Sequence, residues 1–199
     1  MNPRTTRILL LGGAFTAGLV LFLAVFFLVA GPRLGTTPTA AAIGGPFELV
    51  DQRGQRITEQ DFKGKPYLVF FGFTHCPDVC PTTLFEVSEV LRTLGPDANR
   101  TAALFVTVDP ERDTPSAMND YLSSFDPRLR GATGSPEQIA AVEKTFRVYS
   151  KKVPNAKGDD YTMDHTSLVY LMDKNGAFVK PFSLKRSAAD AATELRRYF

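Results

Sequence analysis

The fold of this chain is decided by one stretch, VFFGFTHCPDVCP at residues 69–81. An apolar, aromatic-rich run gives way to polar residues and prolines, and an amphipathic segment follows, which is the order of strand, tight loop and helix. Because proline is best tolerated in the first turn of a helix, we expect the helix to begin at about Pro81, with Cys80 near its cap. The apolar run is too continuous for a strand with one wet face, so it belongs in the middle of a sheet covered on both sides.

Cys76 and Cys80 are the two cysteines of the chain, and both fall at this strand-to-helix junction. Unpaired N–H groups at a helix N-terminus favour an anion, and we expect them to lower a thiol pKa below its free value of about 8.5. Thiolate is the form that attacks disulfides and binds metals. A merely structural disulfide is the weaker interpretation, since a bridge closing so short a loop would constrain the unfolded chain little. The position therefore predicts reactive or metal-binding sulfur.

The segments on either side of this stretch complete one α/β domain without internal repeats. We expect, in chain order, a hairpin over 47–57, a strand over 67–73, a helix over 81–94, a strand over 102–108, helices over 114–125 and 135–149, an exposed mobile loop over 150–161, a hairpin over 166–182 and a final helix over 187–199. The last hairpin carries an Asn-Gly turn, and Ser135 starts a capping-box pattern. This order predicts a thioredoxin-like mixed sheet with helices on both faces.

The N-terminal segment is unlike the rest, because no charged residue stands between Ile8 and Ala30. As a helix this run would be roughly 34 Å long, against a hydrocarbon core of about 30 Å, so we predict one transmembrane helix. A cleaved signal peptide is the rival interpretation, but its apolar region is normally only about 7 to 15 residues long. The predicted organisation is a cytoplasmic N-terminus at 1–7, an anchor at 8–30, a flexible Gly, Pro, Thr and Ala linker at 31–45, and the folded domain at 46–199.

Charge indicates where this domain works. Arg4 and Arg7 precede the apolar run, so the positive-inside rule places the N-terminus in the cytoplasm and the domain outside. No long Arg- and Ser-rich presequence precedes the run, which favours a bacterial inner membrane and an oxidising periplasm. Net charge is +2 with acidic and basic residues interspersed, so nothing points to nucleic acid.

The dithiol has two functional interpretations, thiol-disulfide exchange and metal binding. Exchange enzymes use Cys-x-x-Cys, whereas three residues separate Cys76 from Cys80, and this wider spacing permits either a disulfide or a metal between the sulfurs. In thioredoxin-like enzymes a cis-proline usually faces the dithiol at the start of the antiparallel hairpin, and here His165 occupies that region. Two thiolates and an imidazole would form a soft ligand set that suits Cu(I) and also accepts Cu(II). Structural zinc normally requires four protein ligands.

Each candidate residue also has an ordinary structural explanation. His165 fits an exposed loop histidine as well as a ligand, and Asp78 and Asp109 fit turn or cap residues beside proline. His75 is better explained as a structural or outer-shell residue than as a ligand, because its side chain must point away from that of its neighbour Cys76 in extended backbone. A peroxidase of the peroxiredoxin type is disfavoured, since Phe73 stands where its threonine would be.

Three segments together resemble the Sco/SenC family of thioredoxin-like copper chaperones, which assist cytochrome c oxidase assembly. They are GFTHCPDVCP at 72–81, VDPERDTP at 108–115 and Asp164-His165-Thr166, and the resemblance covers nearly all of 46–199. It implies that Cys76, Cys80 and His165 bind copper, as Cu(I), Cu(II) or both, and that Asp78 and Asp109 are outer-shell or docking residues. The family commonly has serine where this chain has Thr166, a change that keeps the hydroxyl.

The resemblance implies a membrane-anchored metallochaperone rather than an enzyme. Its expected acceptor is the binuclear copper site of cytochrome c oxidase subunit II, and another periplasmic copper chaperone is a possible donor. Some family members act instead as thiol-disulfide reductases, so a redox-active pair of Cys76 and Cys80 that keeps the acceptor's cysteines reduced is the alternative.

Overall fold

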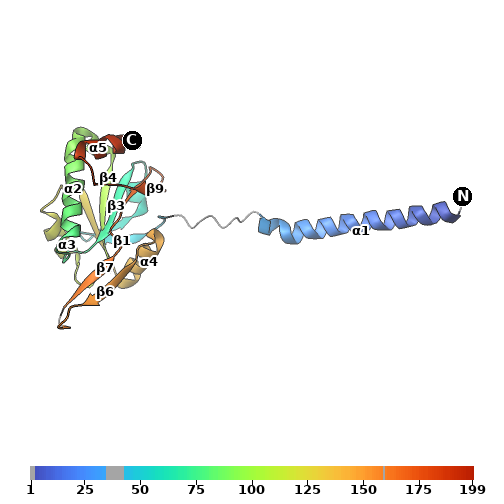
Figure 1. Cartoon of the computed structure of the whole chain (residues 1–199), viewed down its shortest axis with the longest axis horizontal. Helices are drawn as coiled ribbons and strands as arrows, with labels where there is room; N and C mark the ends of the chain where they lie inside the picture. Colours follow the sequence, from blue (N-terminus) through green and yellow to red (C-terminus); the bar gives the residue numbers. More distant parts are fainter. Residues whose placement is uncertain (1–2, 35–42, 159) are drawn as a thin grey trace. The chain divides into compact units, whose positions relative to one another are not determined.

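A computed structural model describes residues 3–34, 43–158 and 160–199 of this chain. The chain divides into two compact units, Met1–Ala41 and Ala42–Phe199. The first unit holds helix α1 (Pro3–Leu34) (Figure 1). Within the described residues, no helix meets the length and hydropathy criteria of a membrane span. The anchor at 8–30 therefore stays a prediction from the sequence. Most of the predicted linker, residues 35–42, lies outside the described residues.

The second unit is built on a seven-stranded mixed sheet in the order β2-β1-β5-β4-β3-β8-β9. Its strands are β1 (Glu48–Asp51), β2 (Arg56–Thr58), β3 (Tyr67–Gly72), β4 (Ala102–Thr107), β5 (Leu129–Thr133), β8 (Val169–Met172) and β9 (Phe178–Pro181). The central strands β3, β4 and β5 run parallel, with β1 and β8 antiparallel on either side of them. Every residue of β3 is buried, which confirms the predicted central strand.

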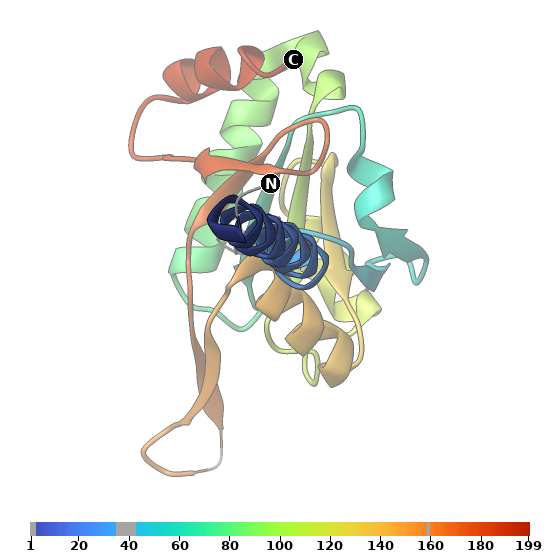
Figure 2. The same ribbon diagram turned by 90° about the vertical axis from the view of Figure 1, so that its right-hand side faces the viewer.

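Helices cover both faces of this sheet, as predicted for a thioredoxin-like fold. They are α2 (Val79–Leu94), α3 (Pro115–Leu122), α4 (Pro136–Phe146) and α5 (Ala188–Arg196), with short 3₁₀ turns η1 (Glu59–Phe62) and η2 (Gly95–Arg100). On one face Phe105 meets Tyr121 of α3, and α2 packs against α5. On the other face Phe71 lies 5.4 Å, ring centre to ring centre, from Phe146 of α4. Figures 1 and 2 show α4 on the side of the sheet opposite α2.

Several predicted helix boundaries differ from those in the structure. Helix α2 begins at Val79 rather than Pro81, so Cys80 lies inside its first turn. Helix α4 ends at Phe146 instead of near residue 149, because Arg147 adopts a left-handed backbone with φ 55° and terminates it. Helix α3 ends at Leu122, three residues before the predicted end at residue 125.

Strand β5 was not predicted, although it lies near the centre of the sheet. Its sequence, LRGAT, contains arginine and glycine, which weaken a strand pattern. A Cβ at Gly131 would lie 2.5 Å from Leu122 Cδ1 and 2.9 Å from Met118 Cε, so these two side chains of α3 would have to move to admit it. Helix α3 thus packs closely over β5 at this glycine.

The prediction of a loop over 150–161 is wrong, because strands form at both ends of this segment. Strand β6 (Ser150–Pro154) pairs antiparallel with β7 (Tyr161–His165) in a separate two-stranded sheet. Most residues of these strands are exposed, so they lack the apolar alternation by which a strand is recognised in a sequence. Figures 1 and 2 show this hairpin projecting away from the main sheet.

Candidate metal and thiol site

Cys80, in the first turn of α2, lies at the end of the central strand β3. Its thiol is fully buried, at 0% exposure, and packs directly over the strand. A Cβ at Gly72 would lie 2.7 Å from Cys80 Sγ, so glycine is needed there for the thiol to fit. Tyr121 of α3 is also close, and its Oη is buried without a hydrogen-bond partner in the structure. The core of the domain thus fixes one of the two sulfurs.

Cys76 lies in the loop before α2 and is only half-buried. The backbone N–H of Cys80 donates to Cys76 Sγ at 3.4 Å, so a donor of the first helical turn points at this sulfur. Both cysteines are free thiols in the structure. Of the two, Cys76 is the one that solvent or an incoming protein can reach.

The expected lowering of the thiol pKa does not hold for Cys80. Burial raises the pKa of the Cys80 thiol far above its ordinary value. The thiolate would lose its hydration in the core, and the donors of the helix N-terminus do not compensate for that loss. Without a bound cation, Cys80 is therefore a neutral thiol. A metal ion that binds it must displace the proton.

His165 also lies close to the Cys80 thiol. His165 Nε2 lies 3.8 Å from Cys80 Sγ, and its Nδ1 lies 3.0 Å from the carbonyl oxygen of Thr166. A carbonyl only accepts, so Nδ1 is the donor nitrogen, and in the neutral imidazole Nε2 is the nitrogen left to accept on the side of the thiol. Phe73 packs edge-on against the imidazole, with ring centres 5.8 Å apart. The histidine is thus oriented as a nitrogen ligand would be.

The three expected ligands therefore gather at one place, although they do not form a closed metal cage. Among the described residues, no group of three or more His, Cys, Asp or Glu side chains has the spacing of a metal site. Cys80 contacts both Cys76 and His165, so it is the common member of the two close pairs.

The two aspartates of the predicted outer shell occupy different environments. Asp78 is exposed at the N-cap of α2, and its side chain makes no capping hydrogen bond. Asp109 is fully buried and accepts hydrogen bonds from Arg112 Nε and Tyr161 Oη. A buried carboxylate cannot dock a partner directly, so only a supporting role fits the position of Asp109.

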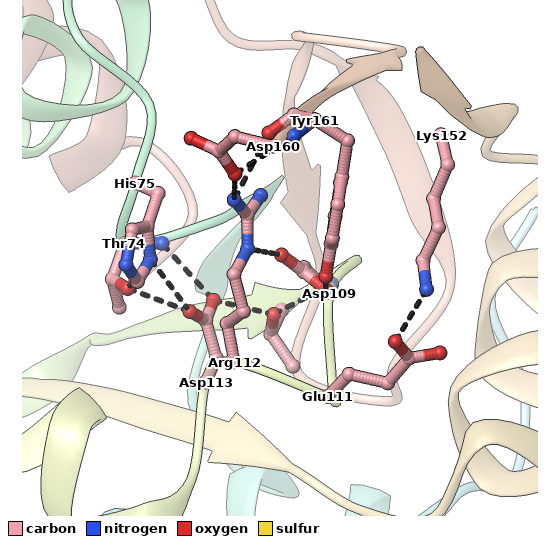
Figure 3. A network of polar contacts seen from close by, with 10 residues as sticks. Thr74, His75, Asp109, Glu111, Arg112, Asp113, Lys152, Asp160 and Tyr161 are labelled. Carbon is pink, nitrogen blue, oxygen red and sulfur yellow. Dashed lines mark hydrogen bonds and ion pairs between the residues drawn. The ribbon is translucent and has the colours of Figure 1, made fainter. Parts of the chain in front are cut away.

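A polar network that the sequence analysis did not identify surrounds Asp109 (Figure 3). Asp113 is buried and accepts hydrogen bonds from Thr74 and from Thr107 Oγ1. His75 lies beside it, with Nδ1 3.9 Å from Asp113 Oδ1, and is not placed as a ligand. Arg112 and Asp113 stand in the segment VDPERDTP, directly after a buried parallel strand, and charge clustered there is the signal that could have revealed them. No comparable signal marks Tyr161, which falls in the wrongly predicted loop.

A protein-family model also matches most of the chain. The model described as SCO1/SenC matches residues 35–199. The chain belongs to the SCO1/SenC family. The sequence-based resemblance to this family is thereby confirmed.

Known members of the family show how much of the chain is shared. This chain is 45% identical over 161 residues to the mitochondrial SCO2 homolog of Bos taurus, and the match covers 79% of this chain and 60% of that protein. It is 41% identical over 160 residues to sco1 of Schizosaccharomyces pombe, covering 79% and 61%. The chain thus spans about 60% of the length of these curated relatives.

Solved structures of family members are also similar. ScoI of Bradyrhizobium japonicum, whose structure has copper bound, is 61% identical with a TM-score of 0.77 and covers 79% of this chain and 100% of that one. Yeast Sco1 with copper bound is 36% identical with a TM-score of 0.72, covering 79% and 88%.

Proposed function

We propose that this SCO1/SenC protein is a copper metallochaperone that binds copper through Cys76, Cys80 and His165. The observation that carries the proposal is the position of His165 Nε2, 3.8 Å from the buried Cys80 Sγ, with Cys76 Sγ beside the same residue. Two thiolates and a neutral imidazole are soft donors that suit Cu(I). Copper-bound structures of ScoI and yeast Sco1 support the choice of metal.

The different burial of the two cysteines suggests how the metal would leave. Copper transfer between proteins is an exchange of ligands, in which acceptor thiolates replace those of the donor one at a time. Cys76 is half-buried and Cys80 fully buried, so an acceptor thiolate would first replace Cys76. Cys80 would be the last sulfur to release the metal and would then recover its proton.

For the acceptor and the location, we propose those implied by the family resemblance. The acceptor is the binuclear copper site of cytochrome c oxidase subunit II, with another periplasmic copper chaperone as a candidate donor. The apolar run at 8–30 would anchor the protein in a bacterial inner membrane, with residues 1–7 in the cytoplasm and the domain at 46–199 in the periplasm. Residues 31–45 would then act as a tether between them.

The second candidate is a thiol-disulfide oxidoreductase that keeps the acceptor's cysteines reduced. The placement of the two free cysteines favours it, because Cys76 is the more accessible of the pair and its Sγ lies 3.4 Å from the backbone N of Cys80. The two functions are linked, since an oxidised pair cannot bind copper. Copper loading would therefore depend on the redox state of the thiols.

The deciding experiment is a titration of the reduced full-length protein with Cu(I) against a competing chelator. Loss of an outer-shell residue typically weakens metal binding about 10–100-fold, so loss of a ligand in His165→Ala should weaken it by more than about 100-fold. His75 is the other histidine of the chain, and His75→Ala is the matched control, with a smaller loss expected.

Two results would reject the three-ligand chaperone. One is weak Cu(I) binding by the unchanged protein, and the other is tight binding that His165→Ala leaves intact. If the weakly binding protein also forms a reversible Cys76–Cys80 disulfide in a glutathione buffer, the oxidoreductase becomes the better assignment.

A further inference from the structure

The backbone of His165 is not part of the main sheet, although Phe73 after β3 packs edge-on against its imidazole. His165 is the last residue of β7, whose described ladder partner is β6, and it pairs there with Ser150. Cys80, in contrast, is buried against β3 of the main sheet. The distance between the imidazole and the thiols therefore depends on what attaches the β6–β7 hairpin to the rest of the domain.

Arg112 makes the principal polar attachment (Figure 3). Its Nη1 donates to the carbonyl oxygen of Tyr161 in β7 at 2.9 Å, and its guanidinium lies 3.8 Å from the centre of the Tyr161 ring. Tyr161 Oη in turn donates to the buried Asp109 carboxylate at 2.9 Å. Asp109 also pairs with Arg112 itself, so the three residues form a closed ring of contacts that includes Tyr161 of β7, the strand that ends at His165.

The same short segment also holds the loop that carries Cys76. Asp113 Oδ2 accepts from the Thr74 backbone N–H at 3.0 Å, and Asp113 Oδ1 accepts from the Thr74 hydroxyl at 2.6 Å. Asp113 is buried and has a second support in Thr107 at the end of β4. Residues 109–113 thus attach to both ligand-bearing segments.

An exposed ion pair adds little to this attachment. Lys152 of β6 pairs with Glu111, but the two side chains are 43% and 59% exposed. Ion pairs at such exposure typically contribute about 0–1 kcal/mol. The ring formed by Arg112, Asp109 and Tyr161 is far less exposed, and its members cannot exchange partners with water as easily.

We propose that residues 109–113 set the separation of His165 from the two thiols, with Arg112 as the positioning residue for the histidine and Asp113 for the cysteine loop. This inference rests on the proposed copper function. It assigns a role to the segment VDPERDTP at 108–115, although none of the residues in this segment is itself a proposed copper ligand. Arg112 would act on metal binding only through His165.

The test is a double-mutant cycle on Cu(I) affinity in the full-length protein. Arg112→Lys keeps a positive charge beside Asp109 but cannot reproduce the planar stacking on Tyr161 together with the bond to its carbonyl. We expect Arg112→Lys to weaken Cu(I) binding about tenfold, the scale of outer-shell effects, and to have no further effect in a His165→Ala background. The Cu(II)-loaded protein should show a matching change in its thiolate-to-copper absorption band.

Arg128→Lys is the matched control. Arg128 pairs with buried Asp126 through two hydrogen bonds, as Arg112 pairs with buried Asp109, but it contacts neither the hairpin nor the cysteine loop. It should leave Cu(I) affinity unchanged in both backgrounds. If Arg112→Lys folds poorly, Tyr161→Phe tests the same ring more mildly, since it removes the bond to Asp109 and keeps the aromatic ring.

The outcomes separate this inference from the proposed function. If His165→Ala weakens binding and neither Arg112→Lys nor Tyr161→Phe does, the positioning role is rejected and the three-ligand site stands. Equal losses from Arg112→Lys with and without His165 would also reject the role, because the effect would then not pass through the histidine. If His165→Ala has no effect, both proposals fall.

Discussion

The cysteine side of the site and the histidine side are built differently. Cys80 sits in the first turn of α2, over the all-buried strand β3, where its position follows from the packing of the whole core. His165 ends a largely exposed two-stranded hairpin, whose strand β7 contacts Arg112 and Asp109 through Tyr161. Under the positioning proposal, the core would keep Cys80 fixed while small changes at the hairpin adjust the affinity of the site.

The largest effect on this comparison should come from the core of the main sheet, on the face that α4 covers. Phe71→Ala removes a fully buried ring that packs on Phe146 and Tyr170, and such truncations cost about 3–5 kcal/mol. Urea unfolding followed by circular dichroism measures the loss. Val153→Ala in the exposed hairpin is the contrasting variant, with a change within about 0.5 kcal/mol. Similar losses for both would show that the hairpin is as integral as the core.

Gly72→Ala tests whether the core also sets the Cys80 thiol itself. The new Cβ would lie 2.7 Å from Cys80 Sγ and 2.8 Å from the Phe105 ring, so overpacking should lower the free energy of unfolding by about 1–3 kcal/mol. A displaced Cys80 should also react faster with an alkylating reagent, as measured by mass spectrometry. An unchanged alkylation rate would mean that the strand gives way and the thiol does not.

The histidine side should respond to alkaline pH. Burial and the hydrogen bond to Asp109 raise the pKa of Tyr161 from 10.0 to about 12. The folded state then holds this proton more tightly than the unfolded state, so the stabilisation is complete below pH 10 and is lost as pH rises toward about 12. Tyr161→Phe should make the stability curve flatter over this range, as measured by urea unfolding at each pH. Identical slopes in the two proteins would contradict the predicted contribution of Tyr161.

The smallest effect is expected at the exposed ion pair. Lys152→Ala removes the contact with Glu111 and should lower the free energy of unfolding by less than about 1 kcal/mol. The difference from the unchanged protein should shrink further in high salt, because salt screens exposed charges. A large loss of Cu(I) affinity in Lys152→Ala would shift the positioning role from Arg112 toward this ion pair.

The sequence by itself determined those features that leave a local pattern. Continuous apolar character placed β3 at the centre of the sheet, and capping residues placed the starts of α3 and α4 at Thr114 and Ser135. These predictions succeeded because periodicity, caps and turn residues act over a few neighbouring residues. The resemblance to the Sco/SenC family brought Cys76, Cys80 and His165 forward as one copper site, and this ligand set stays a prediction.

Only the tertiary structure decided what depends on contacts between distant segments. Strand β5 has a weak strand sequence and pairs with β4 on one side and β1 on the other, and the β6–β7 hairpin forms from largely exposed strands. Burial raises the pKa of Cys80, against the expectation from a helix N-terminus. The bond between Arg112 and Tyr161 joins residues far apart in the chain, and no local pattern encodes it, because burial and long-range hydrogen bonds arise only when the whole chain has packed.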